Sequence, residues 1–330
     1  MRIVDMHCDT ITALYARQQE GMHEDLKKNG LHIDLEKLKA GDYLLQNFAV
    51  FVHMGSEKKP FEYCMRVIDH FYTEIEKYPE LIGAVRTYED IEKNIEAGRM
   101  SALLTIEEGA VCQGEIEFLR DFYRLGVRML TLTWNFPNEI GFPNQILGSD
   151  GKRTFGYNTE EGLTEKGIEF VKEMNRLGMI IDVSHLSDAG FWDVVKYTNR
   201  PFVASHSDAR AMGSHPRNMS DEMIRALSEK GGVMGINYAP AFLEDRENSA
   251  DCQSTPENMV RHMKHIINVG GIQCLGLGSD FDGIRGNLHI DSAAKMYMLE
   301  DEMKKNGFNS SDIDAIFGGN VLRVYKEMLK

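Results

Sequence analysis

The sequence lacks the features that would connect the protein to a membrane or to an oxidising compartment. No positively charged stretch followed by an apolar run opens the chain, and no apolar run reaches the roughly 18 residues of a membrane-spanning helix. The five cysteines are odd in number, widely spaced and without a CxxC pair, which favours reduced thiols and argues against a cysteine zinc site. We therefore expect a cytoplasmic protein.

The charge balance also argues against two classes of partner. Lys and Arg number 37 and Asp and Glu number 51, which gives a formal net charge of −14. An acidic surface repels phosphate backbones and anionic lipids, so we expect neither a nucleic acid nor a membrane surface as a partner. The hydrophobic fraction of 42% is typical of a globular protein.

Short, continuously apolar runs recur along the chain and alternate with amphipathic segments. A parallel strand that is buried on both faces shows this continuous pattern. Such runs occupy residues 3–9, 47–53, 102–107, 128–134, 179–185, 201–206, 232–238 and 274–280. Eight repeats predict a (β/α)8 TIM-type barrel forming a single domain over residues 1–330, with a doubly wound open sheet as the alternative. Residues 10–46 and 137–160 are long connections expected on the catalytic face, and 292–330 are expected to form closing helices.

Helical patterns lie between the apolar runs. Apolar residues recur every three or four positions in segments 61–77 and 162–177. Thr164 and Ser220 are suited to cap two helices at their N-termini, and Gly178 is suited to end one.

Side chains of the metal-ligating type stand at the ends of five of the eight runs. A lone His at a strand end is usually a structural hydrogen bonder, and a lone Asp usually caps the next helix. Their coincidence at the carboxyl edge, where barrel enzymes build their sites, argues against those readings. The residues are His7, Asp9, Glu107, Glu108, His185, His206 and Asp280.

The chemistry of this set suits a pair of divalent ions. His7 and Asp9 are two residues apart, so on an extended strand they would face the same side and could bind one ion. His185 and His206 could grip a second, with a carboxylate from run 102–107 bridging the two. Nitrogen and oxygen ligands without thiolates favour two Zn²⁺ per chain, with Mn²⁺, Fe²⁺ and Co²⁺ as alternatives.

An acid–base residue would complete a hydrolytic site. Two adjacent ions that share a water lower its pKa from 15.7 towards about 7. Asp280 could take the proton of that water and pass it to the leaving group. Asp282 would face the same side if the strand continued, and residue order alone leaves both open.

At these residues the sequence resembles the membrane (renal-type) dipeptidase family of zinc peptidases, among the amidohydrolase-like metal barrels. The resemblance extends from the first run to the last helices. The matching segments are DMHCDT at 5–10, LLTIEEGA at 103–110, RMLTLTWN at 128–135, NRLGMIIDVSHLS at 175–187, SHSDAR at 205–210, HPRNMSDEM at 215–223, GINY at 235–238 and GLGSDFDG at 276–283.

The resemblance implies a role for each site residue. It implies that His7 and Asp9 bind the first zinc, that Glu107 rather than Glu108 bridges, and that His185 and His206 bind the second. It also implies an acid–base role for Asp280, a substrate-carboxylate role for Arg217 and a substrate-facing position for Tyr238. The family's membrane forms use a lipid anchor and disulfides, and we expect an intracellular version here.

Trp134 is the one departure from the family pattern. Well-studied members carry a histidine directly after LTLT, where it binds the substrate and stabilises the oxyanion. An indole N–H donates one hydrogen bond but cannot become cationic, and losing one oxyanion donor typically costs about 10²–10³ in rate. The change bears on the substrate and leaves the metal ligands untouched.

Three functional hypotheses follow. The first is a dinuclear zinc dipeptidase that tolerates a D-residue at the C-terminal position, and for this enzyme we expect a homodimer. The second keeps the zinc pair but takes N-acyl amino acids or another small amide. The third is a metal-binding protein without catalysis, against which the presence of Asp280 and Arg217 counts.

Overall fold

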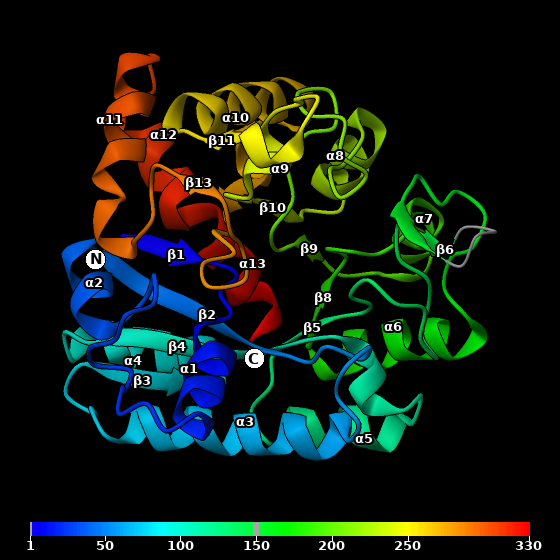
Figure 1. The fold of residues 1–330 in the computed structure, drawn as a ribbon, viewed down its shortest axis with the longest axis horizontal. Helices are drawn as coiled ribbons and strands as arrows, with labels where there is room; N and C mark the ends of the chain where they lie inside the picture. Colours follow the sequence, from blue (N-terminus) through cyan, green and yellow to red (C-terminus); the bar gives the residue numbers. More distant parts are fainter. Residues whose placement is uncertain (1, 148–151) are drawn as a thin grey trace.

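Eight parallel strands close into a barrel (Figure 1). The computed structural model describes residues 2–147 and 152–330. Around the ring the strands are β1 (Ile3–Asp5), β2 (Tyr43–Phe51), β4 (Met100–Glu107), β5 (Met129–Thr131), β8 (Ile180–Asp182), β9 (Val203–Ala204), β10 (Val233–Ile236) and β12 (Leu275–Leu277), which pairs with β1 again. Each of the eight predicted runs overlaps one of these strands, and six of the runs contain the whole strand. The (β/α)8 prediction is confirmed, and the open-sheet alternative is wrong.

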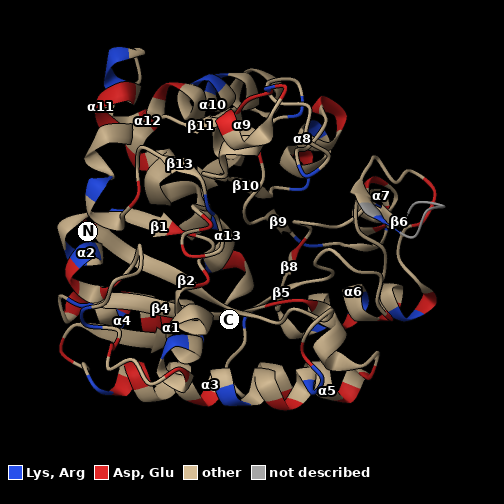
Figure 2. Cartoon of the chain, in the orientation of Figure 1, with Lys and Arg blue, Asp and Glu red and all other residues tan. Residues whose placement is uncertain are grey.

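Helices surround the strands on the outside of the barrel (Figure 1). They include α3 (Pro60–Glu76), α4 (Tyr88–Glu96), α5 (Ile116–Arg124), α6 (Glu165–Leu177), α7 (Asp188–Tyr197), α8 (Asp221–Glu229) and α10 (Pro256–Gly270). Thr164 and Ser220 cap α6 and α8 as predicted, and Gly178 ends α6 with a φ of 77°. Charged side chains concentrate on these helices and on the loops (Figure 2).

Several elements add to the barrel without having been predicted. β3 (Ile82–Val85) pairs with the first residues of β4, and β5 pairs with the last ones. The long connection at 137–160 contains the antiparallel pair β6 (Gln145–Leu147) and β7 (Arg153–Phe155). A second small pair joins β11 (Gln253–Ser254) to β13 (Asn287–Leu288).

The connection at 10–46 and the final segment are mostly helical. The first contains α1 (Thr10–Gln19) and α2 (Leu35–Ala40), and α9 (Pro240–Leu243) follows β10. The expected closing helices are α11 (Tyr297–Lys305), α12 (Ser310–Asp314) and α13 (Asn320–Met328), with a π-helical turn at Ala315–Gly319.

The amino end of the barrel is closed by α13. Arg323 donates to the carbonyls of Gly231 and Gln273, which lie two residues before β10 and β12 respectively. The Tyr325 hydroxyl reaches into the barrel and lies 2.8 Å from Nδ2 of Asn47. Apolar side chains of the strands and of α13 fill the space between them: Val4, Met6, Leu45, Leu103, Met129, Ile180, Val203, Val233, Val321, Val324 and Met328.

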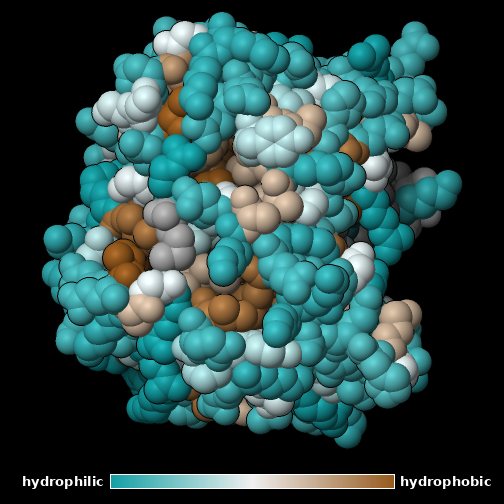
Figure 3. Space-filling view, turned by 90° about the vertical axis from the view of Figure 1, so that its left-hand side faces the viewer, coloured by the Kyte–Doolittle hydropathy of each residue, from teal (hydrophilic) through white to brown (hydrophobic). Residues whose placement is uncertain are grey.

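The outside of the molecule is mostly polar. One face, turned by 90° from the view of Figure 1, is largely hydrophilic, with hydrophobic groups in a few separate places (Figure 3). Within residues 2–147 and 152–330, no helix combines the length and the apolar character that crossing a bilayer requires.

Candidate metal centre and active site

The ligand-type side chains predicted at the strand ends converge around Glu107. Its Oε1 lies 2.9 Å from Nε2 of His185 and 3.6 Å from Nε2 of His206, and its Oε2 lies 3.4 Å from Nε2 of His7. The His7 nitrogen is also 3.8 Å from Oδ2 of Asp9. The structure therefore brings all five predicted ligands together at the carboxyl end of the barrel.

The donor set fits divalent metal ions. Nε2 of His7 and Oδ1 of Asp9 are buried without a hydrogen-bond partner among the described residues, and such groups are costly unless a ligand satisfies them. Ligand atoms lie within 4.8 Å of one another in two sets, one of His7, Glu107 and His206 and one of His7, Asp9 and Asp280. Imidazole nitrogens and carboxylate oxygens gathered in this way suit a divalent metal ion.

The ionisation of His185, His206 and Glu107 matches what metal ligands need. His7 differs, because burial opposes its charged form but Glu107 and Asp9 outweigh burial and raise its pKa well above the ordinary value. Burial lowers the pKa of His185 to about 4 and that of His206 to about 3, so both imidazoles are neutral at pH 7. Burial opposes ionisation of Glu107, but the neighbouring His7, His185 and His206 outweigh it and lower its pKa well below the ordinary value. Neutral imidazole and ionised carboxylate are the forms that bind metal.

Four of the five ligands stand just beyond the strands, whereas Glu107 is the last residue of β4. β1 ends at Asp5, so the argument that His7 and Asp9 share one side of an extended strand is wrong, although both side chains do reach the site. Asp9 instead occupies the N-cap position of α1. His185 and Asp280 have φ values of 70° and 60°, a strained backbone that costs about 1–3 kcal/mol per residue and clusters at functional sites.

Glu108 serves a different purpose from Glu107. Its carboxylate accepts hydrogen bonds from the backbone N–H of Ala110, the backbone N–H of Trp134 and Nδ2 of Asn138. Burial raises its pKa to about 7. Glu108 therefore fixes the loop after β5, while Glu107 faces the metal ligands.

Asp280 and Asp282 likewise have different surroundings and different roles. Asp280 lies 4.0 Å from Nε2 of His7 and accepts a 2.9 Å hydrogen bond from Asn237. Burial and the charges of Asp9 and Glu107 raise its pKa to about 7, against the opposing effect of His7. Asp282 instead accepts from the Thr10 hydroxyl and the His32 N–H, which ties its loop to the segment around α1.

Arg217 lies behind the site with unused hydrogen-bonding capacity. It is 5% exposed, and its Nη2 donates to the carbonyl of His206 at 3.3 Å. Its Nε is buried without a partner among the described residues. Burial lowers its pKa to about 10, so the guanidinium is still charged at pH 7. A buried cation with a free N–H is suited to bind a carboxylate.

Trp134 and Tyr238 occupy different environments. Trp134 lines the cavity, with ring centroids 5.0 Å from Phe51 and 6.0 Å from His185. Tyr238 is fully buried, and its hydroxyl lies 3.4 Å from the sulfur of Met296. The structure thus differs from the expected substrate-facing position of Tyr238, because its side chain packs behind Phe281 rather than lining the cavity.

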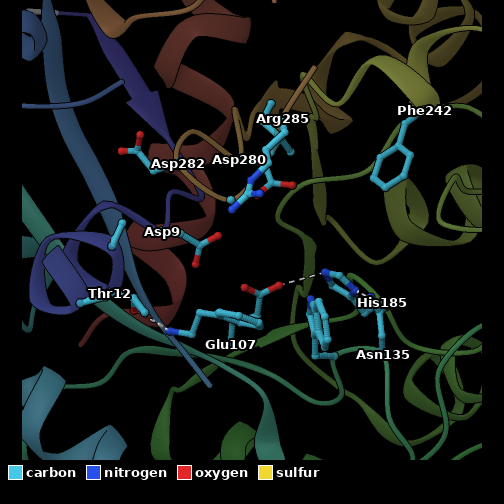
Figure 4. Close-up of a pocket in the computed structure, with 15 residues that line it drawn as sticks. Asp9, Thr12, Glu107, Asn135, His185, Phe242, Asp280, Asp282 and Arg285 are labelled. Atoms are coloured by element: carbon cyan, nitrogen blue, oxygen red, sulfur yellow. Dashed lines mark hydrogen bonds and ion pairs between the residues drawn. The ribbon is translucent and has the colours of Figure 1, made fainter. Parts of the chain in front are cut away.

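A cavity of about 400 Å³ opens above the ligands (Figure 4), within the size range of small-molecule sites. Its walls come from α1, from the last residues of β2 and β4, from the loops after β5 and β8, from α9, and from the turn after β12. Sequence reasoning missed Asn135, whose amide oxygen lies 2.9 Å from Nδ1 of His185, and Arg285 on the turn after Asp280. The pairing of Asn135 with His185 depends on loop geometry that spacing does not reveal.

Comparison with known proteins gives a consistent result. A family model described as membrane dipeptidase (peptidase family M19) matches residues 1–330. Dipeptidase verJ of Clonostachys rogersoniana is 33% identical over 262 residues, which are 79% of this chain and 63% of that protein. An uncharacterized dipeptidase of Schizosaccharomyces pombe is 30% identical over 347 residues, covering 99% of this chain and 80% of that protein.

Solved structures share the whole fold. A metallo peptidase from Rhodobacter sphaeroides, liganded with a phosphinate mimic of the dipeptide L-Ala-D-Ala, has a TM-score of 0.88 and 25% identity over 99% of both chains. The metallo peptidase dipeptidase AC has a TM-score of 0.90 and 26% identity, covering 100% of this chain and 99% of the other.

Proposed function

Because the chain belongs to the membrane dipeptidase family, peptidase family M19, we propose that it is a dinuclear zinc dipeptidase that hydrolyses small dipeptides, including those with a C-terminal D-residue. The observation that carries this proposal is the position of Glu107 between three imidazoles, beside ligand atoms of His7 and Asp9 that find no hydrogen-bond partner among the described residues. Mn²⁺, Fe²⁺ or Co²⁺ would suit the same ligands.

Each ligand has an assigned place in this proposal. His7 and Asp9 would hold one ion, His185 and His206 would hold the other, and the carboxylate of Glu107 would serve both. Bound ions of this kind supply Lewis acidity and activate water at neutral pH. Asn135 orients His185 through its Nδ1 atom, as supporting residues of metal ligands commonly do.

Asp280 carries the proton in the proposed reaction. A pKa of about 7 lets its carboxylate accept a proton from the attacking water and donate it to the leaving amine at neutral pH. The hydrogen bond from Asn237 to Oδ2 leaves Oδ1, the atom nearer His7, to exchange the proton.

Arg217 binds the substrate's C-terminal carboxylate in the proposed complex. A carboxylate held by the guanidinium would fix the end of the dipeptide and leave the last side chain only loosely constrained. This arrangement supports acceptance of a D-residue, and the L-Ala-D-Ala mimic bound to the Rhodobacter sphaeroides relative is consistent with it.

Metal analysis combined with a dipeptide assay tests the proposal. We expect two zinc equivalents per purified chain, loss of dipeptide hydrolysis after chelation, and recovery on adding Zn²⁺. A chain that binds no metal, or that hydrolyses dipeptides equally well with chelator, would refute it.

The presence of Trp134 supports a second candidate function, that of a zinc hydrolase of N-acyl amino acids or another small amide. Its indole forms part of the cavity wall at the position where the family resemblance implies a histidine, and it makes the wall more apolar. Turnover of a panel of L-D dipeptides against N-acetyl amino acids separates the two candidates. The variant Trp134→His should increase dipeptide turnover under the first.

Three further expectations from the sequence belong to the same proposal. We propose that residues 1–330 form one hydrolase domain, that the protein is cytoplasmic, and that it assembles as a homodimer. Fractionation of its host cells measures the location, and light scattering of the purified chain measures the oligomeric state.

A further inference from the structure

Two buried Asp–Ser pairs lie beneath the candidate metal centre and share one geometry. In the first, Asp5 of β1 accepts the backbone N–H of Ser279 at 2.9 Å and its hydroxyl at 2.6 Å. In the second, Asp182 of β8 accepts the backbone N–H of Ser205 at 2.8 Å and its hydroxyl at 2.6 Å. We call each pair a clasp, because it joins neighbouring segments of the barrel.

The clasps stand directly before the site residues. Ser279 precedes Asp280, and Ser205 precedes His206. Each aspartate also accepts the backbone N–H of the residue two positions after it, which is His7 for Asp5, at 3.2 Å, and Ser184 for Asp182, at 3.0 Å. The two halves of the site are therefore held by equivalent hydrogen bonds.

The clasps differ in what the serine hydroxyl meets next. Oγ of Ser205 lies 2.7 Å from Nδ1 of His206, a ring nitrogen. Oγ of Ser279 instead lies near backbone groups, 3.3 Å from the His7 carbonyl and 3.2 Å from the Phe281 N–H. Only the second clasp reaches an imidazole.

The direction of the hydrogen bonds in the second clasp can be deduced. Oδ1 of Asp182 faces two backbone N–H groups, which can only donate, and Oδ2 faces the hydroxyls of Ser205 and Thr131. An ionised carboxylate accepts all four. The Ser205 proton is thereby used on Asp182, so Oγ must accept from Nδ1–H of His206.

We propose that Asp182 and Ser205 are positioning residues that keep the proton of His206 on Nδ1 and so leave the Nε2 lone pair free to bind metal. Nε2 faces the site, 3.0 Å from Nε2 of His185. The Asp5–Ser279 clasp holds the backbone without setting a tautomer. This inference rests on the proposed metal centre, and it assigns a role to residues outside the ligand set.

Matched asparagine variants separate the two roles. In Asp182→Asn the amide oxygen must stay at the Oδ1 position, since the two backbone N–H groups there cannot reverse. The amide NH₂ then faces Ser205, whose hydroxyl turns to its nearer remaining acceptor. That acceptor is Nδ1 of His206 at 2.7 Å rather than Oγ of Ser184 at 3.4 Å, and the ring proton moves to Nε2. In Asp5→Asn the hydroxyl of Ser279 would reverse in the same way, but only backbone groups lie next to it.

Zinc affinity is the first measurement, by competition with a chelating dye on the metal-free full-length chain. We expect Asp182→Asn to bind Zn²⁺ about 10–100-fold more weakly than wild type, as for other groups that support metal ligands. Asp5→Asn should lose no more than about 3-fold, because its reversal reaches no imidazole. Equal losses in the two variants would overturn the proposal.

The tautomer itself is the second measurement and does not depend on activity. Long-range ¹H–¹⁵N NMR of the metal-free, histidine-labelled protein should show His206 protonated at Nδ1 in wild type and at Nε2 in Asp182→Asn. The signal is assigned by its loss in His206→Gln. An Nδ1 proton in both proteins would overturn the proposal.

If Asp182→Asn fails to fold, serine variants test the same inference. Ser205→Ala should weaken zinc binding more than Ser279→Ala, and Ser205→Thr, which retains the hydroxyl, should restore most of the loss. Weakening in Ser205→Ala no greater than in Ser279→Ala would contradict the inference. A wild-type chain that binds no zinc would instead refute the proposed function, while the NMR result would still report on the clasp.

Discussion

The two ends of the barrel are built from opposite kinds of residue. At the carboxyl end, buried carboxylates and imidazoles crowd around Glu107, and some of their polar atoms have no partner among the described residues. At the amino end, apolar side chains of the strands pack against α13, with Tyr325 and Asn47 satisfying each other. In such barrels conservation of the first end reflects catalysis and that of the second reflects stability.

The difference shows where the molecule stores strain. Among the described residues, the non-glycine positions with positive φ are Glu108, Gln113, His185, Asp280 and Asp282, in the loops that follow β4, β8 and β12, and Asp42, just before β2. Most of this strain therefore belongs to the carboxyl end. Unsatisfied polar atoms there add a cost that a metal-free chain must carry. Changes at the carboxyl end should therefore affect activity far more than folding, and changes at the amino end should do the reverse.

Asp280→Asn should give the largest effect and fall on activity alone. Losing the proton carrier should lower kcat by about 10²–10⁴, the usual range for general acid–base catalysis. Two metals per chain and the melting temperature should be retained. Stopped dipeptide assays, metal analysis and calorimetry on the same preparation check this, and unchanged turnover would remove Asp280 from the mechanism.

Tyr325→Ala should show the converse at the amino end. Removing a fully buried ring costs about 3–5 kcal/mol of unfolding free energy, whereas kcat of the folded fraction should change little. The matched variant Tyr325→Phe removes only the hydroxyl that meets Asn47 and should cost about 1–3 kcal/mol. Urea unfolding measures both, and a loss of kcat equal to that of Asp280→Asn would break the comparison.

Arg217→Met should affect substrate binding more than folding. Removing a guanidinium from a carboxylate should lower kcat/KM for dipeptides by about 10²-fold, near the low end of the cost of breaking a buried charged pair. Dipeptide amides, which lack that carboxylate, should be hydrolysed almost equally by both proteins. A parallel loss on the amides would show that Arg217 does not read the carboxylate.

Glu173 on the outer wall should give the smallest effect. Hydrogen bonds from Arg176 and Arg120 lower its pKa to about 2. A carboxyl group whose pKa is lowered on folding stabilises above its unfolded value, about 4.5, and loses that contribution as pH falls towards 2.

The matching variant is Glu173→Gln. It should cost about 1 kcal/mol at pH 7, because Arg176 is exposed and solvent weakens the pair, and almost nothing near pH 2. Urea unfolding at both pH values measures it, and a cost independent of pH would contradict the ion-pair explanation.

The sequence predicted the barrel well because buried parallel strands leave continuous apolar runs. It placed the end of every strand except β4 too far along the chain, since residues such as His185 leave the β conformation to reach the site. It did not predict β3, which pairs only with the first residues of β4 and lies outside the ring of eight strands. These errors concern boundaries and additions and leave the strand order unchanged.

Site residues could be predicted only where their position directly after a strand determines where they lie in the barrel. Ligand-type residues after successive strands meet at one edge, so His185 and His206 could be anticipated. The Asp182–Ser205 clasp could not, because it depends on the register between β8 and β9. The family resemblance did not reveal that the Tyr238 hydroxyl is buried, because its burial depends on packing around Met296.

Closure of the ring has a consequence for synthesis of the protein. Asp5 of β1 pairs with Leu277 of β12, about 270 residues later. At about 5–20 residues per second, a ribosome needs tens of seconds to supply that partner. Until then β1 presents an unpaired edge, the kind of surface that promotes aggregation. Nascent chains stalled before residue 275 should therefore be strong clients of ribosome-associated chaperones.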